Sequence, residues 1–254
     1  MKNILSIRNL KVDLNNKTIL DRINLEVNEN ECLALVGESG SGKTMTALAI
    51  LGLLPEGMKV AEGEIRFLRK DILKLEESIL SKVRGREIGV VFQDPLASFD
   101  PLFKIKTQIQ EVLKCHLFLK RNLDEKVYGL LKEVKISQPE RVSNCYPHQL
   151  SGGMLQRAMI AIAISCSPKL LILDEPTSNL DATIQVQILD LLLNLKEKLK
   201  ISILFITHNL GILKGIADKI SVIRNGEILE TGNFEDVIKS PKSDYTKRLL
   251  EASF

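Results

Sequence analysis

The sequence predicts an α/β fold, in which helices connect the strands of a largely parallel sheet. Two apolar, β-rich runs, LLILDE at residues 170–175 and ISILFITH at 201–208, have the composition of strands buried on both faces of such a sheet. The helix-forming run TIQVQILDLLLNLKEKLK lies between them, so the order is strand, helix, strand. A third apolar run, CLALV at 32–36, leads through a glycine-rich turn into another helical run.

The sequence pattern predicts strands in the N-terminal part of the chain and helices in its middle. Residues 4–36 form short β-like runs divided by the turn-prone DLNNK and NENE, which indicates an antiparallel beginning that feeds one buried strand. The run MTALAILGLL predicts a helix, and Pro55, Gly57 and Gly63 end it before the strand-like GEIRFL. Between about 92 and 149 the runs are helical and charged, which predicts a helical insertion.

Composition gives no indication of several classes of protein. Lys and Arg number 35 against 32 Asp and Glu, a balance that does not indicate a nucleic-acid-binding surface. The four cysteines lie far apart without a CxxC pair, so the sequence indicates neither a zinc site nor a disulfide framework. A membrane-spanning helix needs roughly 18 uncharged apolar residues in a row, and none of the runs reaches that length. We therefore expect a chain that is soluble by itself.

The run GESGSGKT at 37–44 carries the first indication of chemistry. It follows an apolar strand and precedes a helix, which is the context that the pattern GxxxxGK[ST] requires. Its glycines let backbone amides close around phosphate oxygens. Lys43 is expected to reach the β- and γ-phosphates, and the Thr44 hydroxyl is expected to ligate Mg²⁺. The competing interpretation is a glycine-rich turn without a ligand.

Polar side chains end the two apolar runs of the second half. Asp174 and Glu175 fall at a sheet edge of the kind that binds ligands in open α/β folds. Because side chains alternate along a strand, we expect them to point to opposite faces, with Asp174 at Mg²⁺ and Glu175 deprotonating the attacking water. Solvent-facing strand ends are the alternative. His208 is expected near a γ-phosphate, although a lone histidine is more often structural, and Gln93 after VVF has the same standing.

A second loop, LSGGM at 150–154, precedes the helical run MLQRAMIAIAI. Exposed amides at a helix N-terminus favour an anion. One nucleoside triphosphate is already served by the first loop, a metal ion and a water-activating carboxylate. We therefore expect Ser151 and the amides of Gly152 and Gly153 to cover the γ-phosphate held by a second chain, arranged head to tail, so that a dimer has two composite sites.

With these motifs, the sequence resembles the ATP-binding subunit of ABC transporters over nearly its whole length. GESGSGKT is similar to Walker A, Gln93 to the Q-loop, LSGGM to the family signature, LLILDE to Walker B, SNLD to the D-loop and His208 to the switch histidine. The resemblance implies the P-loop NTPase fold of ABC ATPases, with an antiparallel β subdomain and a helical subdomain. It implies a single domain over 1–254, with an ATP-binding core at about 1–92 and 158–235, a helical subdomain at 93–157 and a tail at 236–254.

The resemblance also implies residues that act together on ATP and Mg²⁺. The expected catalytic residues are Lys43, Gln93, Glu175 and His208, and the expected metal ligands are Thr44, Gln93 and Asp174. The expected nucleotide contacts are Gly37, Glu38, Ser39, Gly40, Ser41, Gly42, Lys43, Thr44, Thr46, Gln93 and Asp174, with Ser151, Gly152, Gly153 and Asp181 acting across the dimer.

Further sequence segments indicate which kind of ABC transporter ATPase the chain resembles. RGREIGVVFQDPLASFDP, YPHQLSGGM, DATIQVQIL and SPKSDYTKRLL are similar to importer ATPases for oligopeptides, dipeptides and nickel, of the first of two ATPase kinds, and GGMLQR tilts slightly toward nickel or metal chelates. The implied partners are a second homologous ATPase (a heterodimer, with a homodimer left open), two membrane permease subunits and an extracytoplasmic substrate-binding protein, without nucleic acid. The implied location is peripheral, on the cytoplasmic face of the cell membrane.

Two departures from the family pattern stand out. The family usually stacks an aromatic side chain on adenine from its first strands, yet no aromatic residue precedes Phe67. We expect Leu14 or Val12 in that place and modest discrimination between bases. Ser243 and Asp244 stand where relatives commonly have His-Pro before Tyr-Thr.

Other functions compete with import. A small-molecule kinase with a P-loop has no need of LSGGM. A non-transport ABC ATPase of DNA repair would insert a long coiled coil, for which the spacing of the two loops is too short, and those of translation usually fuse two cassettes. An ABC ATPase of an exporter is the remaining alternative.

Overall fold

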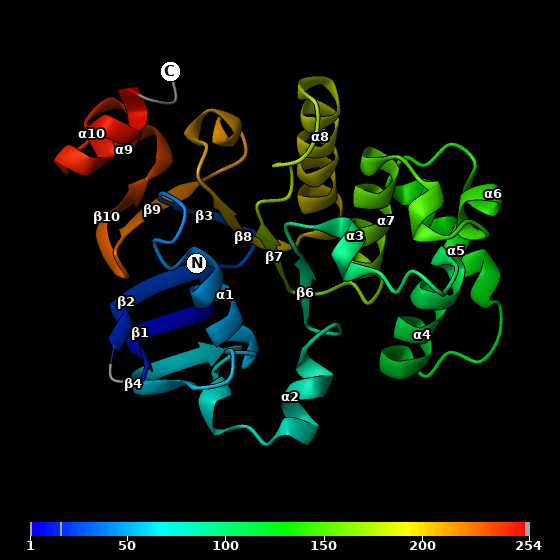
Figure 1. The fold of residues 1–254 in the computed structure, drawn as a ribbon, viewed down its shortest axis with the longest axis horizontal. Helices are drawn as coiled ribbons and strands as arrows, with labels where there is room; N and C mark the ends of the chain where they lie inside the picture. Colours follow the sequence, from blue (N-terminus) through cyan, green and yellow to red (C-terminus); the bar gives the residue numbers. More distant parts are fainter. Residues whose placement is uncertain (1, 16, 252–254) are drawn as a thin grey trace. The chain divides into compact units, whose positions relative to one another are not determined.

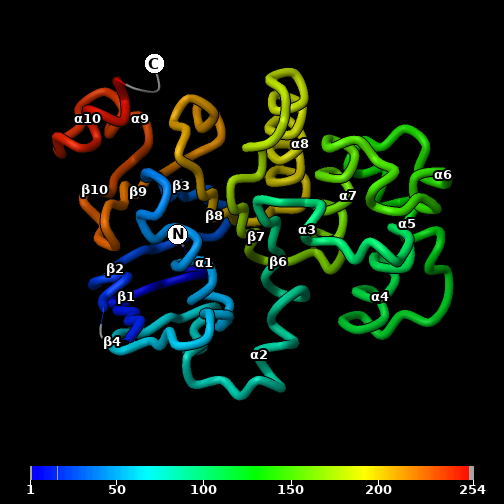
Figure 2. Tube along the Cα trace, in the orientation of Figure 1, coloured from blue at the N-terminus to red at the C-terminus, as the bar shows by residue number. Residues whose placement is uncertain are grey.

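The computed structural model describes residues 2–15 and 17–251, which form two compact units (Figures 1 and 2). The strand-rich unit consists of residues 1–80 and 202–254, and the helical unit of residues 81–201. Helix α2 (Glu77–Val83) contains the boundary between them. The helical subdomain predicted at 93–157 falls inside the helical unit. Within the described residues, every helix is too short or too polar to cross a membrane.

The strand-rich unit begins with an antiparallel sheet, as the sequence predicts. Strand β1 (Asn3–Leu14) pairs with β2 (Lys17–Asn28) on one side and with β4 (Met58–Phe67) on the other, and β5 (Lys70–Asp71) follows β4. The register between β1 and β4 shifts between Arg8 and Lys11. Gly63 lies opposite this bulge at φ 98°, where a Cβ atom would come within 2.5 Å of the Asn9 carbonyl oxygen. The bulge therefore requires glycine.

The second sheet of this unit is built around a fully buried strand. Strand β3 (Cys32–Val36) runs parallel to β8 (Ser202–Thr207) and to β9 (Lys219–Arg224), which lie on either side of it. Strand β10 (Glu227–Asn233) pairs antiparallel with β9. The side chains of β3 are at most 1% exposed, which matches the continuous apolar run CLALV. The helical elements of the unit are η1 (Ile72–Lys74), α1 (Lys43–Leu51), η3 (Leu210–Leu213), α9 (Phe234–Lys239) and α10 (Asp244–Glu251).

The helical unit surrounds a parallel strand pair. Strand β6 (Ile88–Val91) pairs with β7 (Leu170–Asp174). Helix α7 (Gly152–Ile164) packs so closely on β6 that a Cβ at Gly89 would lie 2.2 Å from the Ala163 carbonyl oxygen. The other helical elements are α3 (Pro95–Ser98), α4 (Ile105–Leu117), α5 (Leu123–Glu133), α6 (Pro139–Ser143), η2 (Pro147–Gln149) and α8 (Ala182–Leu199).

A buried arginine joins three helices of this unit. Arg157 on α7 donates to the Val134 carbonyl oxygen, which follows α5, at 2.9 Å, and to the Gln187 side chain on α8 at 3.1 Å. Burial lowers the pKa of its guanidinium, which nevertheless stays charged because arginine titrates far above neutral pH. The helix that follows LSGGM is thus held by hydrogen bonds as well as by apolar packing.

The start of α10 is fixed by a carboxylate and a hydroxyl. The side chain of Glu230 on β10 accepts hydrogen bonds from the backbone amides of Lys242, at 2.9 Å, and Ser243, at 3.1 Å. The Ser243 hydroxyl accepts from the amides of Tyr245 and Thr246, which caps the helix. Ser243, one of the departures from the expected family pattern, therefore has a structural role of its own.

We predict that Glu230→Gln destabilises the protein in a pH-dependent way. Burial raises the pKa of Glu230, but the hydrogen bonds to its carboxylate, that from the Lys242 amide foremost, together with the positive charge of Lys242, outweigh burial, and the net pKa is lowered. Hydrogen bonds to a charged group are worth about 1.5–3 kcal/mol, so losing the charge should lower the free energy of unfolding by about 1–2 kcal/mol at pH 7.

This contribution is fully present above the unfolded-state pKa, near 4.5, and is lost as the pH falls through the lowered folded-state value. Denaturant unfolding between pH 7 and about pH 3 should show a constant gap between Glu230→Gln and the native chain down to about pH 4.5, and a gap that closes below that pH. Glu227→Gln, at an exposed position on the same strand, is the control. A gap of constant size at every pH would contradict the charge-based explanation.

Candidate active site

The loop between β3 and α1 has the backbone of a phosphate-binding loop. Gly40 and Gly42 have φ angles of 78° and 109°, in the left-handed region that favours glycine. A Cβ at Gly37 would lie 2.2 Å from the Ile223 carbonyl oxygen, so the loop leaves the strand against the backbone of β9. Gly42 is the N-cap of α1, and no side chain among the described residues caps this helix. The amides of its first turn are therefore available to an anion.

Lys43, the first residue of α1, turns back onto the loop. Its side chain is 5% exposed, and its ammonium donates to the carbonyl oxygens of Gly37, at 2.7 Å, and Glu38, at 2.9 Å. Three of the other predicted contacts, Glu38, Ser39 and Gly40, are exposed at the loop tip. Thr44, in the first turn of α1, is exposed as well. The predicted contact at Thr46 is different, because its side chain is fully buried and its hydroxyl donates to the Gly42 carbonyl oxygen at 3.0 Å.

His208 lies at the same edge of the sheet as this loop. In the parallel pairing of β3 with β8, Val36 lies opposite Thr207. Gly37 directly follows β3 and His208 directly follows β8, and His208 is exposed. The register thus brings the phosphate loop and the histidine out of neighbouring strands at the same level.

Asp174 and Glu175, the two carboxylates of the helical unit, lie at the end of strand β7, and only the first of them belongs to the strand. Strand β7 ends at Asp174, which is 4% exposed, and Glu175 has a φ of 47°. Glu175 therefore belongs to a turn, in which its carbonyl oxygen accepts from the Ser178 hydroxyl at 3.1 Å. A non-glycine residue in the left-handed region is strained, and such strain clusters at functional sites. The conformation of Glu175 is therefore that of a turn, whereas Asp174 still belongs to the strand.

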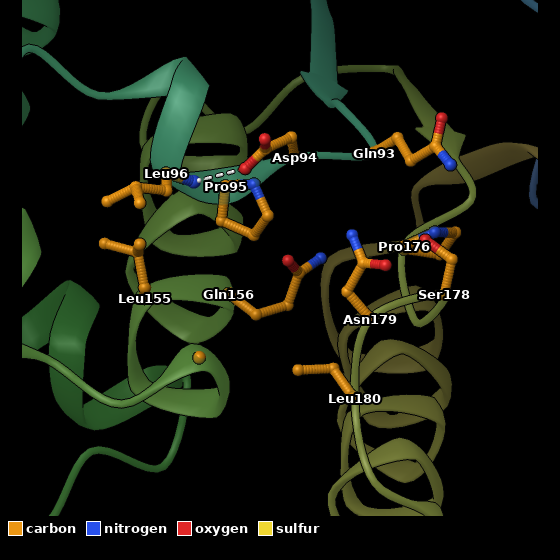
Figure 3. Close-up of a pocket in the computed structure, with 11 residues that line it drawn as sticks. Gln93, Asp94, Pro95, Leu96, Leu155, Gln156, Pro176, Ser178, Asn179 and Leu180 are labelled. Atoms are coloured by element: carbon orange, nitrogen blue, oxygen red, sulfur yellow. Dashed lines mark hydrogen bonds between the residues drawn. The ribbon is translucent and has the colours of Figure 1, made fainter.

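Gln93 follows the neighbouring strand at the corresponding edge. Val91, the last residue of β6, pairs with Leu173, so the chain leaves both strands at one level. Gln93 also lines a cavity of about 170 Å³ (Figure 3). In that view the side chain of Gln156 points from α7 toward Asn179, a residue of the turn after Glu175. The sequence predicts Gln93, and Asn179 falls within SNLD, the segment similar to the D-loop, whereas Gln156 is not predicted as a site residue.

The loop LSGGM is explained in part by packing. Ser151 caps α7, its hydroxyl accepting from the Met154 amide at 3.4 Å, and Asp181 caps α8 by accepting from the Ile184 amide at 3.0 Å. A Cβ at Gly153 would approach the Ile184 Cγ2 atom to 2.8 Å. One at Gly152 would meet the described neighbours no closer than 3.6 Å, and this glycine is exposed. Gly153 is thus needed for the packing of α7 on α8, whereas packing does not require Gly152.

The proposed substitutes for an adenine-stacking aromatic differ in accessibility. Val12 is 0% exposed within β1, so it cannot present a surface to a base. Of the two predicted alternatives, Val12 is therefore wrong because its side chain is buried in the core. Leu14 is half-buried at the end of the strand and keeps part of its apolar surface accessible.

The chain is similar to proteins of established families. A family profile described as ABC transporter matches residues 20–178, and one described as an AAA domain, putative AbiEii toxin, matches 143–214. The chain is 42% identical to the oligopeptide transport ATP-binding protein AppD of Bacillus subtilis, over 98% of this chain and 78% of the relative. It is also 42% identical to the dipeptide transport ATP-binding protein DppD of Haemophilus influenzae, over 98% of this chain and 77% of the relative.

Two solved structures share the fold. The first is cbiO1 from Clostridium perfringens, described as part of an ABC transporter complex, with a TM-score of 0.82 and 27% identity over 94% of this chain and 92% of that chain. The second is the ATP-binding cassette MJ0796, described as a dimer bound to ADP and phosphate in a post-hydrolysis state. Its TM-score is 0.78 at 26% identity, over 91% of this chain and 99% of that chain.

We predict that alanine is tolerated at Gly152 but not at Gly153. Overpacking typically costs about 1–3 kcal/mol, so Gly153→Ala should be less stable than Gly152→Ala by about 1 kcal/mol or more, measured by denaturant unfolding. Ile184→Ala removes the atoms that the new methyl group would meet. The double variant Gly153→Ala/Ile184→Ala should therefore be more stable than the sum of the single effects predicts. Additive effects would show that the contact with Ile184 does not determine the glycine.

Proposed function

The chain belongs to the ABC transporter family of ATP-binding proteins, and from this premise we propose that it is the ATP-hydrolysing subunit of a peptide importer. The family assignment confirms the predicted ABC ATPase fold and the ATPase activity. The observation that best supports the proposal is the identity of 42% over nearly the whole chain to ATPases named for oligopeptide and dipeptide transport. The predicted tilt toward nickel finds no support in those names.

In the proposed mechanism, the phosphate loop binds ATP through its amides and through Lys43. The ammonium of Lys43 already contacts two carbonyl oxygens of the loop, so its charge lies beside the amides that would receive the phosphates. Glu175 deprotonates the attacking water, a role that suits a carboxylate held in a strained turn beside the end of β7. His208 contacts the γ-phosphate from the strand next to the loop. Gln93 senses the same phosphate from the end of β6.

Mg²⁺ is proposed to be held by Thr44, Gln93 and Asp174. Hydroxyl, amide and carboxylate oxygens are the hard ligands that this ion prefers, and the exposed Thr44 hydroxyl at the start of α1 fits that chemistry. When bound, the ion neutralises charge on the β- and γ-phosphates. Thr46 takes part through its position in α1 only, since its hydroxyl is used within the helix.

Across a head-to-tail dimer, Ser151, Gly152, Gly153 and Asp181 are proposed to complete the site of the other subunit. The exposure of Ser151, Gly152 and Asp181 supports this arrangement, as does the dimeric state described for the similar cassette MJ0796. We further propose a second homologous ATPase as the partner, two membrane permease subunits, a substrate-binding protein and a peripheral location at the membrane.

Two variants separate hydrolysis from binding. Loss of a general base typically costs roughly 10²- to 10⁴-fold in rate, so Glu175→Gln should keep ATP affinity while losing turnover by that factor. Lys43→Ala should instead weaken ATP binding by about 10- to 100-fold, because it removes a charge-assisted contact. Phosphate release and nucleotide titration measure the two quantities. Full activity in Glu175→Gln would remove Glu175 from the mechanism.

The cargo is tested by uptake of labelled dipeptide, oligopeptide and nickel in cells that carry this chain. Glu175→Gln should abolish peptide uptake and leave nickel uptake unchanged. Glu197→Gln, an exposed carboxylate on α8, is the matched control and should transport normally. Loss of nickel uptake with peptide uptake intact would contradict the peptide assignment and support a metal or metal-chelate importer.

A further inference from the structure

The C-terminal helix contacts the phosphate loop directly. Tyr245 on α10 is 5% exposed, and its hydroxyl accepts a hydrogen bond from the backbone N–H of Glu38 at 3.1 Å. That N–H belongs to the peptide bond that joins Gly37 to Glu38. The carbonyl oxygen of the same peptide bond accepts from the Lys43 ammonium at 2.7 Å. One peptide unit therefore has its oxygen bound by Lys43 and its N–H bound by Tyr245.

This arrangement links the hydroxyl of Tyr245 to the position of the lysine. N–H and C=O point in opposite directions in a trans peptide, so hydrogen bonds at both ends oppose rotation of the unit. If the unit rotated, the Gly37 carbonyl oxygen would move and Lys43 would lose this acceptor. The lysine is thus oriented in part by a residue more than 200 positions away in the sequence.

Tyr245 is itself held in place from several sides. The guanidinium carbon of Arg224 lies 4.8 Å from the centre of its ring, within the range of a cation–π contact. Arg224 begins the turn to β10, in which the Gly226 amide donates to the Ser41 carbonyl oxygen of the phosphate loop at 2.9 Å. The Ser243 cap and the Glu230 carboxylate fix the start of α10 on the other side.

We propose that Tyr245 is a positioning residue of the nucleotide site, which acts through the Gly37–Glu38 peptide to orient Lys43 toward the phosphates. The inference rests on the proposed role of Lys43 in binding ATP and extends it to the C-terminal helix. In this proposal, one neutral hydrogen bond, from the Glu38 N–H to the Tyr245 hydroxyl, helps to orient the Lys43 ammonium toward the bound phosphates.

The test compares Tyr245→Phe with Tyr128→Phe, which removes the same atom from α5. A net hydrogen bond of ordinary strength corresponds to about a fivefold change in an equilibrium constant. Tyr245→Phe should raise the ATP dissociation constant and the KM by about that factor, with the unfolding midpoint close to that of the native chain. Tyr128→Phe should leave ATP binding unchanged.

The same substitution made in the Lys43→Ala variant distinguishes a positioning role of Tyr245 from a general structural effect. In Lys43→Ala the ammonium is absent, so adding Tyr245→Phe should leave the ATP affinity of that variant nearly unchanged in titrations extended to millimolar nucleotide. An equal loss of affinity in both backgrounds, or no loss in either, would overturn the proposal. If Lys43→Ala binds ATP as well as the native chain, the proposed role of Lys43 fails instead, which is a separate result.

Discussion

The parallel register of β3 with β8 is the constraint on which the strand-rich half of the site depends. The five pairs run from Cys32 with Ile203 to Val36 with Thr207, and these residues are buried. A slip of one residue would exchange the faces of every side chain in a strand, which apolar packing on both faces strongly disfavours. Because the register is fixed, the phosphate loop and His208 leave the sheet at one level. Their proximity is a consequence of core packing.

Close backbone contacts carry this constraint into the loops. Gly37 lies against the Ile223 carbonyl oxygen, where a Cβ atom would be only 2.2 Å away. The first residue of the phosphate loop is therefore in direct contact with the backbone of β9. Gly89 repeats this logic in the helical unit, against Ala163 of α7. In both places the absence of a side chain lets one element lie directly on another. The phosphate loop is therefore positioned in part by a main-chain contact with β9.

Most of the architecture follows from local patterns in the sequence. CLALV predicts β3 with its observed bounds, and the run at 183–200 predicts α8 to within one residue. The failures occur where geometry departs from a regular period. Alternation along a strand does not describe Glu175, because β7 has already ended and the next residue adopts a left-handed conformation. The alternative at Val12 fails because this side chain is buried, and the run of short β-like segments does not show which of its apolar residues stay accessible. The contact between Tyr245 and Glu38 joins distant segments and leaves no local periodicity to detect.

The caps of the helices explain why one chain carries two loops suited to an anion. Among the described side chains none caps α1, whose N-cap is Gly42, so the amides of its first turn are left for a ligand. The start of α7 is different, because Ser151 already accepts from the Met154 amide, at a long 3.4 Å. A phosphate at α7 would compete with that weak cap, whereas a phosphate at α1 has no side chain to displace. The first loop is therefore suited to holding a phosphate, and the second to touching one that is held elsewhere. This difference in capping supports the proposed arrangement, in which the first loop of one subunit and the second loop of the other act on the same ATP.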